Sequence, residues 1–99
     1  MIVPDKCAAV AAALIAEHDI ELRDPADDNP GPLSVCEDAV NAMEPEDMLA
    51  VIWTCQAGGV EWFVSCVSVS EPHESLHEVL KYAAMVALDM TIQEQLAAK

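Results

Sequence analysis

The start of the chain predicts one helix. Residues 7–18 read CAAVAAALIAEH, in which Val10 and Leu14 lie one helical turn apart and alanines fill most other positions. Pro4 stands where a proline suits the first turn of a helix. Residues 19–23 then alternate polar and apolar side chains, which fits either a frayed helix end or a short strand.

A loop and a second, shorter helix come next. Residues 24–33 hold three prolines, one glycine and three aspartates, so they are predicted to form a loop. Ser34 and Glu37 match the S-x-x-E capping box, in which each side chain bonds a free backbone N–H at a helix start. A helix over about residues 35–42 follows, and Pro45 marks its end. Its predicted buried side chains are Val35, Ala39, Val40 and Met43.

Two strand-like runs give the strongest structural signal. They are MLAVIWTCQ at 48–56 and VEWFVSCVSV at 60–69, both rich in β-branched and aromatic residues. Gly58 and Gly59 lie between them, and a glycine pair suits a two-residue hairpin turn. The pattern therefore predicts a β-hairpin.

The register of this hairpin distributes its aromatic side chains over two faces. With Gly58 and Gly59 as the loop, Trp53 pairs with Val64 on the face that also carries Trp62. Both tryptophans are therefore predicted to belong to the core. The opposite face is only partly polar, so we expect a helix, a second subunit or a partner protein to cover it. Its candidate apolar contacts are Ile52, Phe63 and Val67.

A long final helix is predicted from about Pro72 to Leu96, with Ser70 as its cap. The elements then follow in the order α-α-β-β-α. The predicted fold class is α+β, a small single domain over residues 1–99 with an antiparallel β-hairpin packed against helices. The final helix has a broad apolar side made of Leu76, Val79, Leu80, Ala83, Val86, Ala87 and Met90.

Composition adds a strong negative charge to this chain. Eighteen Asp and Glu face four Lys and Arg, which gives a formal net charge of −14, while 54% of the residues are hydrophobic. This charge argues against direct binding to nucleic acid or to an anionic membrane. No stretch approaches the roughly 20 apolar residues that a membrane span requires. We expect a soluble protein of the cytoplasm, of the host cytoplasm if a phage encodes it.

The acids are unevenly spread. Eleven of the eighteen lie within residues 17–47, where Arg23 is the only Lys or Arg, and a smaller group flanks the start of the final helix. A solvated surface explains this pattern, and so does a negative face that docks on a Lys- and Arg-rich partner. The candidate partner-binding acids are Asp24, Asp27, Asp28, Glu37, Asp38, Glu44, Glu46, Asp47, Glu71, Glu74 and Glu78.

Residues 73–77 read HESLH and match the HExxH pattern. Over these five residues the chain resembles the zincin metallopeptidases, which implies His73 and His77 as zinc ligands and Glu74 as the base acting on the metal-bound water. Pro72 directly precedes the motif, and no third ligand is recognisable downstream. We therefore expect no catalytic residue, no bound metal and no cofactor.

The four cysteines carry no recognisable chemistry in the sequence. They show neither the spacing of a structural zinc site nor that of a disulfide framework. We expect reduced thiols, most of them buried. They are Cys7, Cys36, Cys55 and Cys66.

Size and charge together favour a binding protein over an enzyme. In these two respects the chain resembles the small phage-encoded inhibitors, anti-CRISPR proteins and DNA mimics among them. The resemblance implies a non-enzymatic module that occupies a basic, nucleic-acid-binding surface of a partner protein. Two alternatives stay open: a minimal HExxH zinc hydrolase, and a homodimeric phage or bacterial structural protein.

The HExxH motif generates the first prediction. Purified protein is expected to carry no stoichiometric zinc, and replacing His73 and His77 with alanine is expected to change stability by less than about 0.5 kcal/mol, because no complete ligand set accompanies them. Elemental analysis and urea unfolding check this. About one zinc per chain would contradict it.

Overall fold

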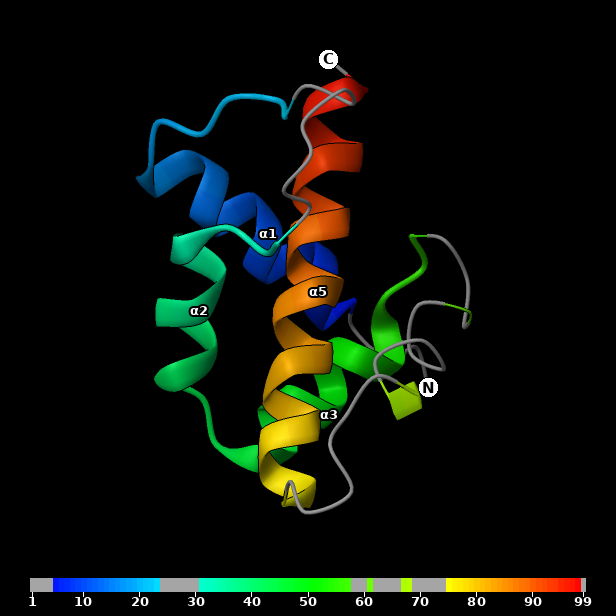
Figure 1. Cartoon of the computed structure of the whole chain (residues 1–99). Helices are drawn as coiled ribbons and strands as arrows, with labels where there is room; N and C mark the ends of the chain where they lie inside the picture. Colours follow the sequence, from blue (N-terminus) through cyan, green and yellow to red (C-terminus); the bar gives the residue numbers. More distant parts are fainter. Residues whose placement is uncertain (1–4, 24–30, 58–60, 62–66, 69–74, 99) are drawn as a thin grey trace.

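The computed structural model describes residues 5–23, 31–57, 61, 67–68 and 75–98, and over these residues the protein is all-helical (Figure 1). Four helices have defined bounds, and the described residues hold no β-strand. The α+β prediction is therefore wrong. The helices are α1 (Lys6–Glu17), α2 (Ser34–Asn41), α3 (Pro45–Thr54) and α5 (Leu76–Ala97).

Helix α1 forms where the alanine-rich stretch predicted a helix. Asp5 caps it, because the Asp5 side chain accepts a hydrogen bond of 2.9 Å from the backbone N–H of Ala8. Cys7, Ala11 and Leu14 are buried. They follow one another at intervals of four and three residues, so they share one face of the helix.

Helix α2 confirms the second predicted helix, although its cap differs. Leu33 is the N-cap and makes no side-chain capping bond, whereas Ser34 is already helical. The expected capping box of Ser34 and Glu37 is therefore not formed. Val40 is buried as expected, and Cys36 joins it in the core.

Helix α3 replaces the first strand of the predicted hairpin. Pro45 lies in the first turn with Glu46 and Asp47 after it, a start that favours a helix through the fixed proline φ and the helix dipole. Met48 and Val51 are buried three residues apart, which is helical spacing. This periodicity overrides the strand preference of the individual side chains.

The second predicted strand is contradicted where the structure describes it. Glu61, Val67 and Ser68 have helical backbone. Residues 60, 62–66 and 69, with Phe63 among them, lie outside the described residues.

The side chains that were assigned to the two faces of the hairpin have different surroundings in the helical structure. Trp53 is 84% exposed, so its assignment to the core is wrong. Ile52 is partly buried and packs against the core. Val67 is exposed, as an apolar contact residue would be. A strand register places neighbouring side chains on opposite faces, whereas a helix turns each by about 100°, and this difference moves Trp53 outward.

Helix α5 forms the centre of the molecule and packs against each of the other three helices (Figure 1). Ser75 caps it by accepting a hydrogen bond from the Glu78 N–H, in place of the predicted Ser70. Small side chains let the neighbouring helices approach closely. Leu76, expected on the apolar side, is 74% exposed. The buried face of α5 consists of Ala83, Ala84, Ala87, Leu88, Asp89, Thr91 and Ile92.

One charge lies in this core. Asp89 is 6% exposed and forms an ion pair with Arg23, whose backbone N–H also donates a 2.7 Å hydrogen bond to the Gln93 side-chain oxygen. Burial raises the pKa of the Asp89 carboxyl above its usual value, and Arg23 partly offsets this effect. The pair fixes the segment after α1 onto α5.

Among the described residues, none of the helices combines the length and the apolar character needed to cross a bilayer.

The second prediction concerns this ion pair. Replacing Arg23 with methionine is expected to lower the free energy of unfolding by about 2–4 kcal/mol at pH 7, because an unpaired carboxylate would remain buried. Asp89 has its pKa raised by folding, so its protonated form favours the folded state and its ionisation is what costs stability. The loss should therefore shrink as pH falls toward the Asp89 pKa.

Urea unfolding of a double-mutant cycle checks this prediction. In the Asp89→Asn background, Arg23→Met should cost little, because no charge is left unpaired. An equal cost in both backgrounds, independent of pH, would contradict it.

Candidate functional site

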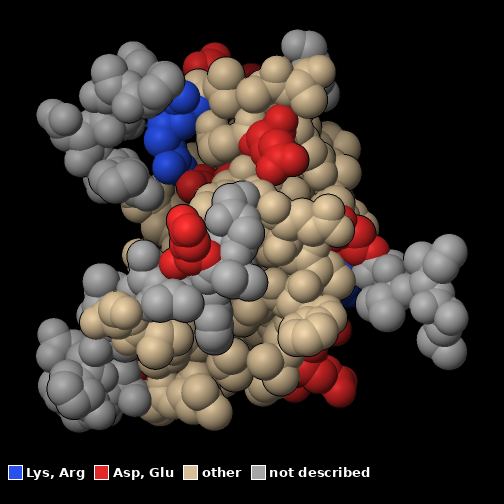
Figure 2. Space-filling model, turned by 90° about the vertical axis from the view of Figure 1, so that its right-hand side faces the viewer, with Lys and Arg blue, Asp and Glu red and all other residues tan. Residues whose placement is uncertain are grey.

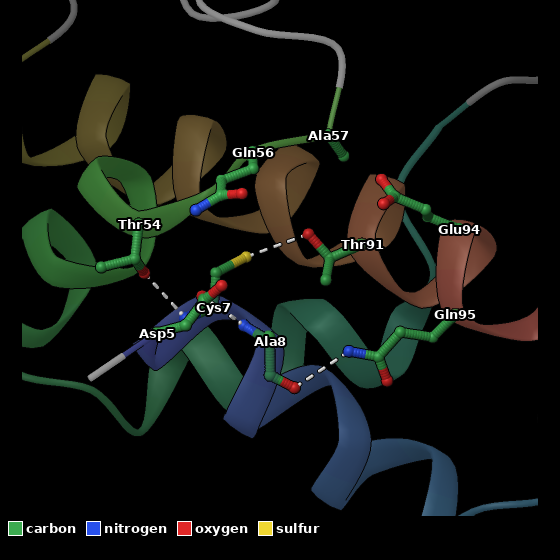
Figure 3. A pocket seen from close by; sticks show the side chains of 9 residues that line it. All are labelled: Asp5, Cys7, Ala8, Thr54, Gln56, Ala57, Thr91, Glu94 and Gln95. Carbon is green, nitrogen blue, oxygen red and sulfur yellow. Dashed lines mark hydrogen bonds between the residues drawn. The ribbon is translucent and has the colours of Figure 1, made fainter. Parts of the chain in front are cut away.

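The most chemically distinctive feature of the described structure is a small polar hollow where α1, α3 and α5 meet (Figure 3). Its volume is about 110 Å³. Ligand sites for drug-sized molecules usually hold roughly 300–1,000 Å³, so this hollow suits waters or a molecule of a few atoms. Its lining consists of Asp5, Cys7, Ala8, Thr54, Gln56, Ala57, Thr91, Glu94 and Gln95.

Hydrogen bonds between helices fix the walls of the hollow (Figure 3). The Cys7 N–H at the start of α1 donates to the Thr54 hydroxyl oxygen at the end of α3, at 2.9 Å. The Gln95 side-chain NH₂ on α5 donates to the Ala8 carbonyl at 3.1 Å. The first bond satisfies a backbone N–H that is free at the start of α1, and the second ties α5 to α1.

Two cysteine sulfurs share the same neighbours beside this hollow. Cys7 Sγ lies 3.1 Å from Thr91 Oγ1 and 3.6 Å from the Ala87 carbonyl oxygen. Cys55 Sγ lies 3.7 Å from each of the same two atoms. Cys7 is 1% exposed, and Cys55, which follows α3 directly, is half-buried. The chain therefore brings together two thiols that are 48 residues apart in sequence.

The two thiols have opposite acidities. The neighbouring Cys7 side chain favours the ionised form of Cys55 and lowers the pKa of Cys55 to about 6, even though burial opposes ionisation. The neighbouring Cys55 side chain, together with burial, raises the pKa of Cys7. Of the two thiols, Cys55 is therefore the one that ionises first.

The hydroxyl of Thr91 is the second group that influences the ionisation of Cys55. Thr91 Oγ1 donates to the Ala87 carbonyl at 2.9 Å, and it also helps to lower the Cys55 pKa. A hydroxyl has one hydrogen but two acceptor lone pairs, so it can turn from the carbonyl to a thiolate. Once Cys55 is ionised, both the Cys7 thiol and the Thr91 hydroxyl can donate to it.

Cys36 is a structural thiol by comparison. It is fully buried on α2, and burial raises its pKa to about 12. It therefore stays protonated, and solvent does not reach it.

The predicted acidic site is only partly described, and the described acids are spread over the surface. Figure 2 shows acidic side chains in separate groups around a broad area without charge. Those on α2 and α3 and at the start of α5 are exposed, apart from the half-buried Asp47: Glu37, Asp38, Glu44, Glu46 and Glu78. The remaining candidates lie outside the described residues: Asp24, Asp27, Asp28, Glu71 and Glu74.

Of the two candidate zinc ligands, the structure describes only His77. His77 is exposed in the first turn of α5, and His73 lies outside the described residues. Within residues 5–23, 31–57, 61, 67–68 and 75–98, no three His, Cys, Asp or Glu side chains come together as a metal site would require.

Sequence reasoning missed the thiol pair. The hairpin register placed Cys55 opposite Trp62, and nothing in the spacing links Cys7 to Cys55. The helical spacing of Met48, Val51 and Cys55 could have indicated that Cys55 faces the core, although not that it meets Cys7 there.

The comparisons with known proteins add no relative. No family model, no curated protein and no solved structure matches the chain.

The third prediction follows from the acidity of Cys55. The rate of Cys55 alkylation by iodoacetamide in folded protein is expected to rise with a midpoint near pH 6, because the thiolate is the nucleophile. Replacing Cys7 with alanine should move the midpoint upward, since the Cys55 thiolate then loses a neighbouring hydrogen-bond donor.

Peptide mapping by mass spectrometry after timed alkylation checks this. Cys36 serves as the internal control and should stay unmodified until the protein unfolds. A Cys55 midpoint at about pH 8.5, the value of an ordinary thiol, would contradict the prediction.

Proposed function

We propose that this protein is a non-enzymatic binding module that docks on a basic surface of another protein. The partner surface is a Lys- and Arg-rich one of the kind that normally binds nucleic acid, and the module acts as an inhibitor by occupying it. The single observation that carries the proposal is an exposed apolar stripe on α3 next to carboxylates.

The stripe consists of Leu49 and Trp53. Glu46 lies three residues before Leu49, and Trp53 four residues after it, so all three share one side of α3. Leu49 is 52% exposed and Trp53 is 84% exposed. Tryptophan is the side chain most enriched among interface residues that dominate binding energy, because it buries a large area at low entropic cost. A tryptophan this exposed on a well-formed helix supports a binding role.

The charge around the stripe selects the chemistry of the partner. Glu44, Glu46 and Asp47 stand at the start of α3. Of the Lys and Arg residues that the structure describes, Arg23 is engaged by Asp89, which leaves Lys6 and Lys81. The chain as a whole carries a formal net charge of −14. A partner with clustered Lys and Arg gains a faster encounter from this field.

The same charge disfavours the homodimer alternative. Two copies that met through Trp53 would bring two acidic helix starts together, and like charges in an interface cost several kcal/mol. The zinc hydrolase alternative gains no third ligand from the described residues.

The fourth prediction tests the stripe and the charge separately. The partner is first identified by crosslinking in the native host from a photoreactive residue at position 49, with the same residue at Tyr82, an exposed position on α5, as the control. Trp53→Ala is then expected to weaken binding of the purified partner by about 2 kcal/mol or more, roughly 30-fold, chiefly through faster dissociation. Tyr82→Ala is the matched control and should leave binding within about twofold.

Three sets of variants test the charge, and each set removes three carboxylates. Glu44→Gln, Glu46→Gln and Asp47→Asn together should slow association several-fold and flatten its salt dependence. Glu17→Gln, Asp19→Asn and Glu21→Gln remove three charges elsewhere. Asp24→Asn, Asp27→Asn and Asp28→Asn test the loop that the sequence favoured.

Stopped-flow association at low and high salt reads out all three sets. Slowing confined to the α3 set supports the stripe, and slowing confined to the loop set moves the contact to residues 24–28. Association insensitive to salt and to every set would contradict the proposal. Self-association that depends on Trp53 would favour the homodimer instead.

A further inference from the structure

The paired thiols serve no step in the proposed binding function. Cys7 and Cys55 contact the same hydroxyl and the same carbonyl, at 3.1 to 3.7 Å. The two sulfurs therefore meet the same turn of α5, one from the start of α1 and one from just after α3. Both are free thiols in this structure.

Their surroundings differ in the way that a reacting pair requires. Cys55 keeps some exposure to solvent, whereas Cys7 is enclosed. The Thr91 hydroxyl lies within reach of both sulfurs and is itself buried. A reactive cysteine beside a second, protonated cysteine is the arrangement in which one thiol is oxidised and the other resolves it.

We propose that Cys7 and Cys55 form a peroxide-responsive dithiol site, in which Cys55 reacts with a small hydroperoxide and Cys7 resolves the product to an intramolecular disulfide. The site is a modification site and is independent of the binding function proposed above.

The chemistry balances with one peroxide. The Cys55 thiolate attacks one peroxide oxygen, the O–O bond breaks, and the departing oxygen takes a proton and leaves as water or an alcohol. Cys55 is thereby oxidised to a sulfenic acid. The Cys7 sulfur then attacks the Cys55 sulfur and the S–O bond breaks, and the departing hydroxyl takes the Cys7 thiol proton and leaves as water. Two thiols and one hydrogen peroxide become one disulfide and two waters.

A small hollow lies beside the pair. It holds about 110 Å³, and its polar rim includes the carboxylates of Asp5 and Glu94 (Figure 3). Cys7 and Thr91 line it and Cys55 does not, but the Thr91 hydroxyl oxygen lies 3.7 Å from the Cys55 sulfur. An oxidant that reaches Cys55 past Thr91 through this hollow has to be small and uncharged, as hydrogen peroxide is. Glutathione disulfide is larger and anionic, so both size and charge disfavour it.

Hydrogen peroxide titration of the full chain tests this proposal. Intact mass under non-reducing conditions should show the loss of two hydrogen atoms, and peptide mapping should show Cys7 joined to Cys55. Reduction by dithiothreitol should restore the starting mass. The disulfide closes the loop from residue 7 to residue 55, so the oxidised protein should also melt at a higher temperature than the reduced protein.

Three single variants separate the roles. Cys7→Ser should accumulate a sulfenic acid at Cys55, trapped by dimedone. Cys55→Ser should slow the consumption of peroxide by at least about tenfold, because the thiolate is lost. Cys36→Ser is the matched control and should oxidise as the unchanged protein does. Circular dichroism confirms that each variant keeps its helices.

Several results would overturn the proposal. They are a disulfide to Cys36 or Cys66, disulfide-linked chains in place of an internal bond, and over-oxidation of Cys55 without disulfide formation. Equal oxidation by glutathione disulfide would overturn the choice of oxidant.

Discussion

The structure depends on the close packing of other helices against the alanine face of α5. Ala83, Ala84 and Ala87 are fully buried and present little more than backbone to their neighbours. Helices α1 and α3 can therefore approach α5 and each other. This approach sets Cys7 and Cys55 against the same turn of α5, at the Ala87 carbonyl and the Thr91 hydroxyl. A bulkier α5 face would hold the two thiols apart.

Charge plays two different roles around this core. Inside, Asp89 is retained because Arg23 neutralises it, and the pair fastens the segment after α1 onto α5. Outside, the exposed acids have few described cations near them and leave a strong negative field. The field and the exposed Trp53 belong together in the binding proposal, since one favours encounter and the other supplies contact area. The thiol pair belongs to the interior and does not depend on either.

The sequence indicated the helices whose patterns were unambiguous. Residues 7–18, 35–42 and the final segment carry alanine, capping or amphipathic signals that agree with their environment, and they form α1, α2 and α5. The segment around Trp53 failed because its β-branched and aromatic residues favour a strand while Pro45 and the spacing of Met48 and Val51 favour a helix. Local preference lost to the packing of α3 against α5. The thiol pair could not be foreseen, because it arises only when two distant helix ends meet on a third.

Helices α1 and α3 meet on α5, with Cys7 and Cys55 at their junction. Solution NMR of the reduced protein can detect this meeting. The fold predicts helical carbon chemical shifts across residues 45–54, together with nuclear Overhauser contacts from the Cys7 β-protons to the Thr91 methyl group and to Cys55. Extended chemical shifts across residues 48–56, with cross-strand contacts between Trp53 and Val64, would contradict it.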